Sequence, residues 1–143
     1  MCGRYVMSKA TSDLLSHFDA KEVEGNPPGP SWNVAPTQNV AIVAERLDEG
    51  PLDRRLLIAK WGLVLSWAKD TKIGSKLINA RSESILEKPS FRSAAVKRRA
   101  IVPGRGLLRM AEDRGWQEDP ELLVLGAGAV AGFRRVVRVL AGS

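Results

Sequence analysis

The residue with the most distinctive chemistry in this sequence is Cys2, the only cysteine, which directly follows Met1. Cysteine is small enough for an initiator methionine to be removed ahead of it, so we expect the mature chain to begin at Cys2. A free α-amine and a thiol would then lie on adjacent carbons. With a reference pKa of about 8 the amine is partly neutral at pH 7, and an unperturbed thiol is a few per cent thiolate. Such an aminothiol can attack an acyl carbon, or capture an aldehyde as an imine that the sulfur closes into a thiazolidine.

Three further segments carry residue types that packing alone would not select. They are Ser31-Trp32-Asn33-Val34-Ala35-Pro36-Thr37, Lys60-Trp61-Gly62-Leu63 with Trp67 shortly after it, and Leu77-Ile78-Asn79-Ala80-Arg81-Ser82-Glu83. An amide beside a thiol can orient a substrate oxygen, an arginine fork suits phosphate, and aromatic or proline side chains can unstack bases. Each feature also has a structural alternative: tryptophan as core filler, Asn79 as a helix cap, and Arg81 as a solvated charge.

Length and composition limit the function classes. A chain of 143 residues with 44% apolar and 27% charged residues fits one domain, and no apolar run approaches the ~20 residues of a membrane span. One cysteine and one histidine, His17, cannot form a zinc site, and His17 is interpreted as a surface or packing residue. We therefore expect no metal, no cofactor, no membrane contact and a cytoplasmic monomer. The net charge of +6 slightly favours an anionic partner.

The hydrophobic pattern predicts an α+β chain with antiparallel strands. We expect a helix over residues 8–19, capped by Thr11 or Ser12, and a loop over 25–30. Apolar runs at 40–44 and 55–60, joined by a turn at 47–51, predict a hairpin. Two short helices at 82–88 and 91–99, separated by Pro89, and a strand starting at residue 100 complete the expected elements.

Taken together, the ordered motifs resemble the SOS-response-associated peptidase (SRAP) family of abasic-site processing proteins. The resemblance includes Met1 to Tyr5, the three segments above, Glu87-Lys88-Pro89-Ser90-Phe91-Arg92 and Arg98-Arg99-Ala100-Ile101-Val102-Pro103, so that it covers residues 1–103. It implies an antiparallel, barrel-like fold with flanking short helices. Residues 1–103 would be the N-terminal part of a SRAP domain.

The resemblance also implies a function for each of the singled-out residues. Family members bind single-stranded DNA and capture the aldehyde of a ring-opened abasic site as a thiazolidine, which protects the lesion during the DNA damage response. Cys2 would be the crosslinking nucleophile, and an autocatalytic removal of Met1 would expose it. Asn79 would position the opened sugar. The remaining roles are phosphate binding by Arg4 and Arg81 and wedging by Pro36 and Trp67 beside Asn33. An abasic site offers no base, so recognition must come from the backbone, stacking and the aldehyde.

After Pro103 the resemblance stops. Residues 104–143 contain no lysine, although eight precede them, and they hold seven of the thirteen glycines. The family continues with a strand such as Ala-x-Gly-Tyr-Tyr-Glu-Trp, and codons for this tail, read one nucleotide late, can spell that strand. We therefore interpret residues 104–143 as an out-of-frame tail, produced by a mutation or a sequencing error. Arg109 then holds the position of the family's proton-transferring glutamate, and the family's later histidine is missing, so the C-terminal half is truncated or altered.

Two rival functions remain open. A glutamine amidohydrolase would also use an N-terminal Cys2, with its α-amine as the base, although the segments around Trp32 and Asn79 argue against it. The other rival is a catalytically silent fragment that binds DNA without crosslinking.

Overall fold

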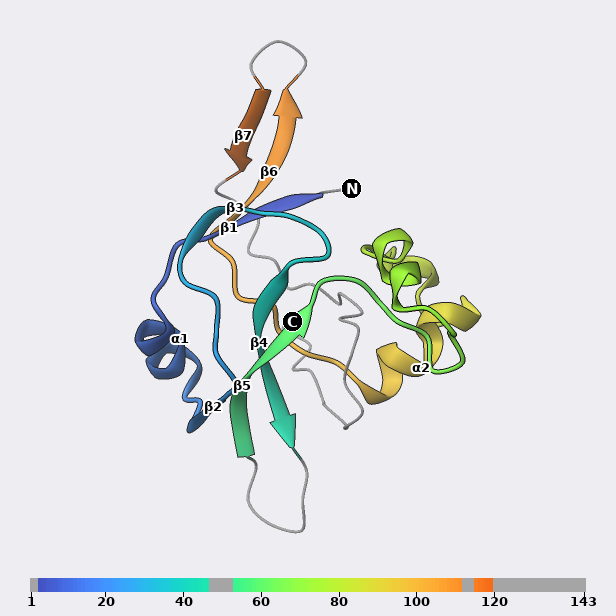
Figure 1. Ribbon diagram of the computed structural model, residues 1–143, viewed down its shortest axis with the longest axis horizontal. Coiled ribbons are helices and arrows are strands. Elements are labelled where there is room, and N and C mark those ends of the chain that lie inside the picture. The colour runs from blue at the N-terminus through green and yellow to red at the C-terminus, as the bar shows by residue number, and fades with distance from the viewer. Residues whose placement is uncertain (1–2, 47–52, 112–114, 120–143) are drawn as a thin grey trace.

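Two β-sheets form the body of the protein in the computed structural model, which describes residues 3–46, 53–111 and 115–119 (Figure 1). The strands are β1 (Arg4–Met7), β2 (Glu22–Glu24), β3 (Ser31–Val34), β4 (Asn39–Arg46), β5 (Asp53–Lys60), β6 (Gly106–Ala111) and β7 (Gly115–Asp119). The helices are α1 (Thr11–Phe18), the 3-10 helices η1 (Thr71–Lys76) and η2 (Ser82–Ser84), and α2 (Pro89–Lys97). One sheet has the order β3-β1-β6-β7 and the other β2-β5-β4. The α+β class is confirmed, but within these residues neither sheet closes into a barrel.

The expected hairpin is present as β4 and β5. Their antiparallel register runs from Asn39 opposite Lys60 to Arg46 opposite Asp53. The apolar run of β4, residues 40–44, is buried throughout, as expected for a strand covered on both faces. The expected turn at 47–51 lies outside the described residues. One pairing is not antiparallel: β2 runs parallel to β5, with Glu22 opposite Arg55, so this sheet is mixed.

Helix α1 confirms the first expected helix, with a different start. Its N-cap is Ala10, which makes no side-chain cap, so the expected capping by Thr11 or Ser12 is wrong. The helix ends at Phe18, and its C-cap, Asp19, has a left-handed φ of 50° and donates its N–H to the carbonyls of Leu15 and Ser16. His17 is exposed, and its ring meets Phe18 edge-on at 4.9 Å, in agreement with a surface and packing role.

The segment after residue 81 departs from expectation. Residues 82–88 form only the one-turn helix η2. Pro89 does not separate two helices but begins α2, because the missing N–H and fixed φ of proline suit the first helical turn. In place of the strand expected from residue 100, Ile101 makes a single antiparallel bridge to Val43, and the next strand, β6, begins at Gly106.

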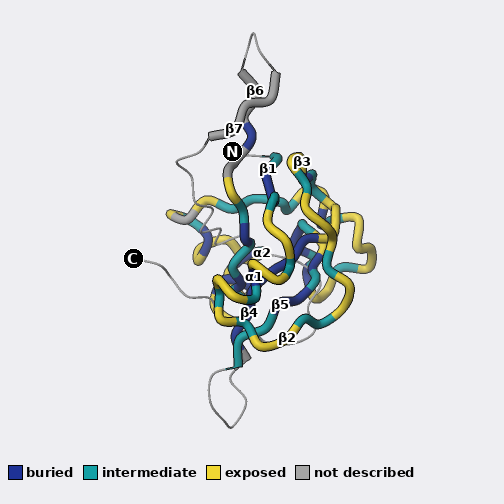
Figure 2. The backbone as a smooth tube through the Cα atoms, turned by 90° about the vertical axis from the view of Figure 1, so that its left-hand side faces the viewer, coloured by how far each residue is buried: buried dark blue, intermediate teal, exposed yellow. Residues whose placement is uncertain are grey.

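Buried hydrophobic residues form two clusters, and Figure 2 marks the buried stretches of the backbone in dark blue. The larger cluster lies between the β4–β5 hairpin, β1 and α1, and includes Tyr5, Leu14, Val34, Ile42 and Leu56. The smaller cluster joins the segment after β5 to α2 through Leu63, Leu65, Ile85, Phe91 and Ala94. The segment of residues 60–63 lies where the two clusters meet, because Trp61 packs against the larger cluster and Leu63 belongs to the smaller one.

Strand β6 pairs with β1 on one side and with β7 on the other. Its Leu108 lies opposite Arg4, and its Met110 lies opposite Trp116. In Figure 1 the β6–β7 hairpin extends beyond the rest of the molecule. The described residues of the expected out-of-frame tail are thus largely in strands, and residues 120–143 lie outside the described part. The boundary at residue 103 stays a prediction.

Candidate functional site

Strand β1 begins two residues after Cys2 and therefore fixes where the N-terminus emerges. Cys2 itself lies outside the described residues. β1 is an inner strand of its sheet, between β3 and β6. Its Tyr5 is opposite Val34 of β3, and the register shifts between Tyr5 and Met7.

Arg4 and Asn33 meet across this pair of strands. The Arg4 Nη1 donates a hydrogen bond to the Asn33 Oδ1 at 3.0 Å. Asn33 is exposed and Arg4 is half-buried. Two of the residues singled out from the sequence are therefore in direct contact, and the amide orients the guanidinium.

Trp61 joins the three chemistry-bearing segments. Its indole Nε1 donates to the carbonyl of Ile78 at 3.0 Å. Its ring meets the Tyr5 ring edge-on, with centroids 5.4 Å apart. Its backbone N–H donates to the carbonyl of Gln38, and its carbonyl accepts from the N–H of Thr37, both at 2.9 Å. The structural alternative, tryptophan as a packing residue, is thus correct for Trp61.

Asn79 directly follows the carbonyl that Trp61 holds. The residue is half-buried and takes part in an interaction. The N-cap position of η2 is occupied by Arg81, which makes no side-chain cap, so Asn79 is not the N-cap residue of this helix. Arg81 is exposed. Leu77 also accepts a hydrogen bond from Leu63 at 2.9 Å, which fixes the segment at a second point.

Pro36 lies in a tight turn that follows β3. The N–H of Ala35 donates to the side-chain oxygen of Gln38 at 2.9 Å, and the N–H of Gln38 donates back to Ala35. Thr37 has a φ of 69°, which is unusual for a β-branched residue and indicates backbone strain. Such strain persists only where the surrounding contacts impose it, here the hydrogen bond to Trp61.

Two tryptophans are exposed rather than buried. Trp32 and Trp67 each expose 66% of their surface, so the interpretation of tryptophan as core filler is wrong for both. The sequence motifs identify Trp67 as a wedge but assign no role to Trp32, although Trp32 immediately precedes Asn33. No sequence signal marks Trp32, because successive side chains of a strand point to opposite faces, so its adjacency to Asn33 does not bring the ring and the amide together.

A cavity of about 330 Å³ opens beside Trp61. Its walls come from the Thr37 turn, the end of β5 and η1, and they include Lys60 and Lys72. Among the described residues that line it, none is acidic. Sequence reasoning missed this group because the lining residues come from three separate segments.

The backbones of Gly62 and Gly74 approach each other closely at this cavity. A Cβ on Gly62 would lie 2.3 Å from the carbonyl oxygen of Gly74, and Gly62 has a φ of 140°. Both requirements exclude any other residue at position 62 without a backbone shift. The glycine of the Trp61-Gly62 pair therefore allows η1 to pack against the end of β5.

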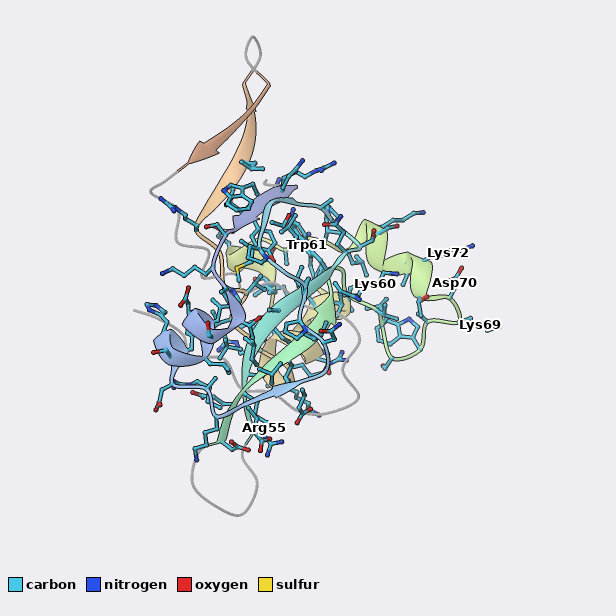
Figure 3. All side chains as sticks on the ribbon, turned by 60° about the vertical axis from the view of Figure 1, so that its left-hand side comes forward. Arg55, Lys60, Trp61, Lys69, Asp70 and Lys72 are labelled. Carbon is cyan, nitrogen blue, oxygen red and sulfur yellow. The ribbon has the colours of Figure 1, made fainter. Side chains whose placement is uncertain are left out.

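The ion pairs of Arg54 and Arg55 lie at the opposite end of β5, where Figure 3 labels Arg55. Arg54 bonds to Glu45 at 2.8 Å, and Arg55 pairs with Glu24 at 2.8 Å and with Asp53 at 2.6 Å. The hydrogen bond that Arg55 donates to the Asp53 carboxylate contributes most to raising the pKa of Arg55. The acidic partners of Arg54 and Arg55 are thus gathered at the end of β5 away from Trp61. In the described ranges, no group of three or more potential metal ligands occurs, and no helix is long and apolar enough to cross a membrane.

Comparison with known proteins identifies the family. The family model described as SOS response associated peptidase (SRAP) matches residues 1–112. Abasic site processing protein YoaM of Bacillus subtilis is 44% identical over 106 residues, which are 72% of this chain and 44% of the relative. Abasic site processing protein HMCES of Rattus norvegicus is 33% identical over 94 residues, covering 60% of this chain and 27% of the relative. The chain therefore spans less than half the length of these relatives.

Solved structures share the fold. A protein from Bacteroides thetaiotaomicron superimposes with a TM-score of 0.62 at 19% identity, covering 83% of this chain and 56% of the other. A protein from Bordetella bronchiseptica gives a TM-score of 0.57 at 23% identity, covering 75% and 50%. Because the family model matches residues 1–112 of 143, this chain is a member of the SOS response associated peptidase (SRAP) family.

Proposed function

We propose that this protein binds abasic sites in single-stranded DNA and becomes covalently linked to them through Cys2, which protects the lesion during the DNA damage response. Family membership and the names of the relatives support the abasic site as the lesion that the protein binds. The observation that carries the proposal is the junction at Trp61. This half-buried side chain ties the Asn79 segment to Tyr5, in the strand that follows Cys2. Trp61 thus connects the segment that carries Asn79 with β1, the strand that follows Cys2.

The covalent step needs no oxidant and no cofactor. The α-amine of Cys2 attacks the aldehyde of the ring-opened sugar, and the resulting imine forms with loss of one water. The thiol then adds across the C=N bond: sulfur bonds to carbon, and the thiol proton goes to nitrogen. Both nucleophiles must be on one residue, so Met1 has to be removed first. We propose that the protein removes it autocatalytically, which translation in a purified system without aminopeptidase would test.

Asn79 and the arginines have separable roles in this proposal. Asn79 positions the opened sugar, whereas Arg4 and Arg81 bind phosphates next to it. Replacing Arg81 by Ala should weaken binding of any single-stranded DNA and flatten the dependence of log K on log salt by about 0.7. Asn79→Ala should slow adduct formation more than it weakens binding. If Asn79→Ala changed affinity alone, its role at the sugar would be wrong.

Pro36 and Trp67 act as wedges beside Asn33. Trp67 is exposed and Pro36 is held in a turn that is hydrogen-bonded to Trp61, so both present apolar surface that bases can stack on. Alanine in place of Trp67 should cost about 1–3 kcal/mol of binding to single-stranded DNA.

A gel assay tests the covalent function. The protein is incubated with a labelled abasic single strand, and adducts that survive heating are counted for the natural chain, for Cys2→Ser, and for a chain blocked in front of Cys2. Only the natural chain should form a heat-stable adduct. A stable adduct with the N-terminus blocked would overturn the aminothiol mechanism. Glutamine hydrolysis without an adduct would instead support an N-terminal-nucleophile amidohydrolase.

A catalytically silent DNA-binding protein is the second candidate. It is favoured by Arg109, which stands in β6 where the family resemblance expects a glutamate. A guanidinium stays protonated at all accessible pH values and cannot pass a proton. This candidate predicts salt-dependent DNA binding with no adduct. In either case we place the protein in the cytoplasm as a monomer without cofactor or metal.

A further inference from the structure

We propose that the cavity beside Trp61 is a phosphate subsite for the DNA strand that carries the abasic sugar. The identity of the strand rests on the proposed function. The cavity measures about 330 Å³, at the lower end of the ~300–1,000 Å³ typical of ligand sites. That volume suits one phosphodiester and its sugar better than a larger organic molecule.

Two lysines from different elements supply the positive charge. Lys60 ends β5 and Lys72 lies in η1, and both line the cavity and are exposed. Among the residues that the structure describes, neither forms an ion pair. The nearby carboxylate of Asp70 accepts the N–H of Lys72 at 2.9 Å and so caps η1. Figure 3 shows Lys69, Asp70 and Lys72 together at the outer edge of this segment, with Lys60 and Trp61 at the end of β5.

Hydroxyl groups supply neutral donors on the same walls. Thr37, Thr71 and Ser75 all line the cavity. The Ser75 hydroxyl donates to the carbonyl of Lys72 at 2.8 Å and therefore stabilises η1. Thr37 and Thr71 are exposed, and within the described ranges the structure shows no hydrogen bond from either hydroxyl. Lysine and hydroxyl donors are the usual side-chain partners of DNA phosphates.

The place of the cavity favours a strand over a small anion. Trp61 forms one wall and also holds the Asn79 segment through Ile78. Thr37, on another wall, directly follows the wedge residue Pro36. A strand whose abasic sugar lies at Asn79 and which passes the wedge thus reaches the cavity within its neighbouring nucleotides. The hydrogen bond from the N–H of Thr37 to the carbonyl of Trp61 holds this wall against the end of β5.

The test compares two double variants of equal charge. Lys60→Gln with Lys72→Gln removes the proposed contacts, whereas Lys9→Gln with Lys21→Gln removes the same charge from exposed positions that flank α1, on the far side of the sheets from η1 and α2 (Figure 1). Fluorescence anisotropy measures binding of an undamaged single-stranded oligonucleotide over a range of salt. A third protein, Lys60→Arg with Lys72→Arg, tests whether positive charge alone is enough to keep binding. Thermal melting verifies that each variant folds.

We expect the 60/72 glutamine variant to flatten the log K against log salt slope by about 1.4, which is two contacts at ~0.7 each. The 9/21 variant should change the slope by less than half of that, and the arginine variant should keep it. Equal changes in both glutamine variants, or none, would overturn the subsite. Because undamaged DNA is used, this result does not depend on Cys2, and loss of adduct formation alone would count against the proposed function instead.

Inorganic phosphate distinguishes the source of the anion. It is titrated at constant ionic strength, and the melting temperature of the natural chain is followed. If the cavity binds DNA, free phosphate should raise the melting temperature little. Replacing Lys60 and Lys72 by glutamine should then still flatten the slope of log K against log salt for the oligonucleotide. Strong stabilisation by phosphate, lost in the 60/72 variant and without any slope change, would show that the cavity takes a small anion and would overturn the assignment to DNA.

Discussion

The indole nitrogen of Trp61 donates a hydrogen bond to the carbonyl oxygen of Ile78 at 3.0 Å. The two residues are 17 positions apart, and the bond places the chain just before Asn79 against a side chain that packs on the larger core cluster. The position of Asn79 relative to β1 therefore depends on the indole of Trp61.

Trp61→Phe should keep the ring contact with Tyr5 but remove the donor to Ile78. A half-buried carbonyl would lose its partner, so we expect a loss of about 1–3 kcal/mol in the free energy of unfolding. Adduct formation with abasic DNA should slow further than this loss explains, because Asn79 is displaced. Denaturant unfolding and adduct time courses measure the two effects.

The exposed Trp32 provides the control. Trp32→Phe keeps an aromatic surface and breaks no hydrogen bond that the structure shows, so stability should change by less than about 0.5 kcal/mol. Equal destabilisation by both substitutions would show that the bond to Ile78 is not what stabilises this region.

Gly62→Ala should strongly destabilise the protein. Its Cβ would be 2.3 Å from the Gly74 carbonyl, in a backbone conformation that alanine rarely adopts. We expect a loss of more than about 2 kcal/mol by denaturant unfolding, with η1 and the cavity most affected. Gly29→Ala is the matched substitution, since a Cβ at position 29 would have no neighbouring atom within 4 Å. A near-neutral Gly62→Ala would contradict the close approach of Gly62 to Gly74.

Tyr5 should make the fold sensitive to alkaline pH. Burial raises the pKa of Tyr5 above its ordinary value of about 10, so the folded state holds this proton more tightly than the unfolded state. The stabilisation is complete below pH ~10 and is lost as the pH rises above it. Tyr5 is the only tyrosine, so phenolate absorbance reports this group alone. We expect that absorbance to appear together with unfolding, and a midpoint at or below pH ~10 in folded protein would contradict the burial.

The tail gives a genetic prediction. If residues 104–143 are out of frame, deleting one nucleotide near codon 104 should restore a Tyr-Tyr-Glu-Trp strand in place of β6. The repaired protein should show a sharper thermal transition and form adducts at least tenfold faster, because general acid–base assistance is worth roughly 10²–10⁴ in rate. Equal folding and equal rates in the two proteins would show that the tail is a genuine variant.

Local patterns predict some parts of this structure and miss others for physical reasons. The β4–β5 hairpin is predictable because two apolar β runs flank a polar turn, and α1 because Leu14 and its neighbours have helical spacing. The parallel pairing of β2 is not, since Glu22, Val23 and Glu24 form a strand only where β5 offers a free edge and Arg55 offers charge partners. The start of α2 at Pro89 is also missed, because a proline can either separate two helices or begin one.

The candidate site shows the same division. The order of the motifs predicts Arg4, Asn33 and Asn79 as site residues, and in the structure Arg4 donates a hydrogen bond to Asn33. The cavity beside Trp61 could not be predicted, because Lys60 and Lys72 line the same cavity only when Gly62 packs against Gly74. Trp61 also gives no sequence signal for its hydrogen bond to Ile78, which depends on tertiary contact alone.

The sharpest test of the crosslink at Cys2 is the mass of the product formed with abasic single-stranded DNA. We predict an adduct equal to the chain without Met1 plus the oligonucleotide minus one water, with the link mapped to Cys2. The same product should be absent from Cys2→Ser after heating. An adduct that retains Met1, or one attached at any other residue, would contradict the thiazolidine mechanism.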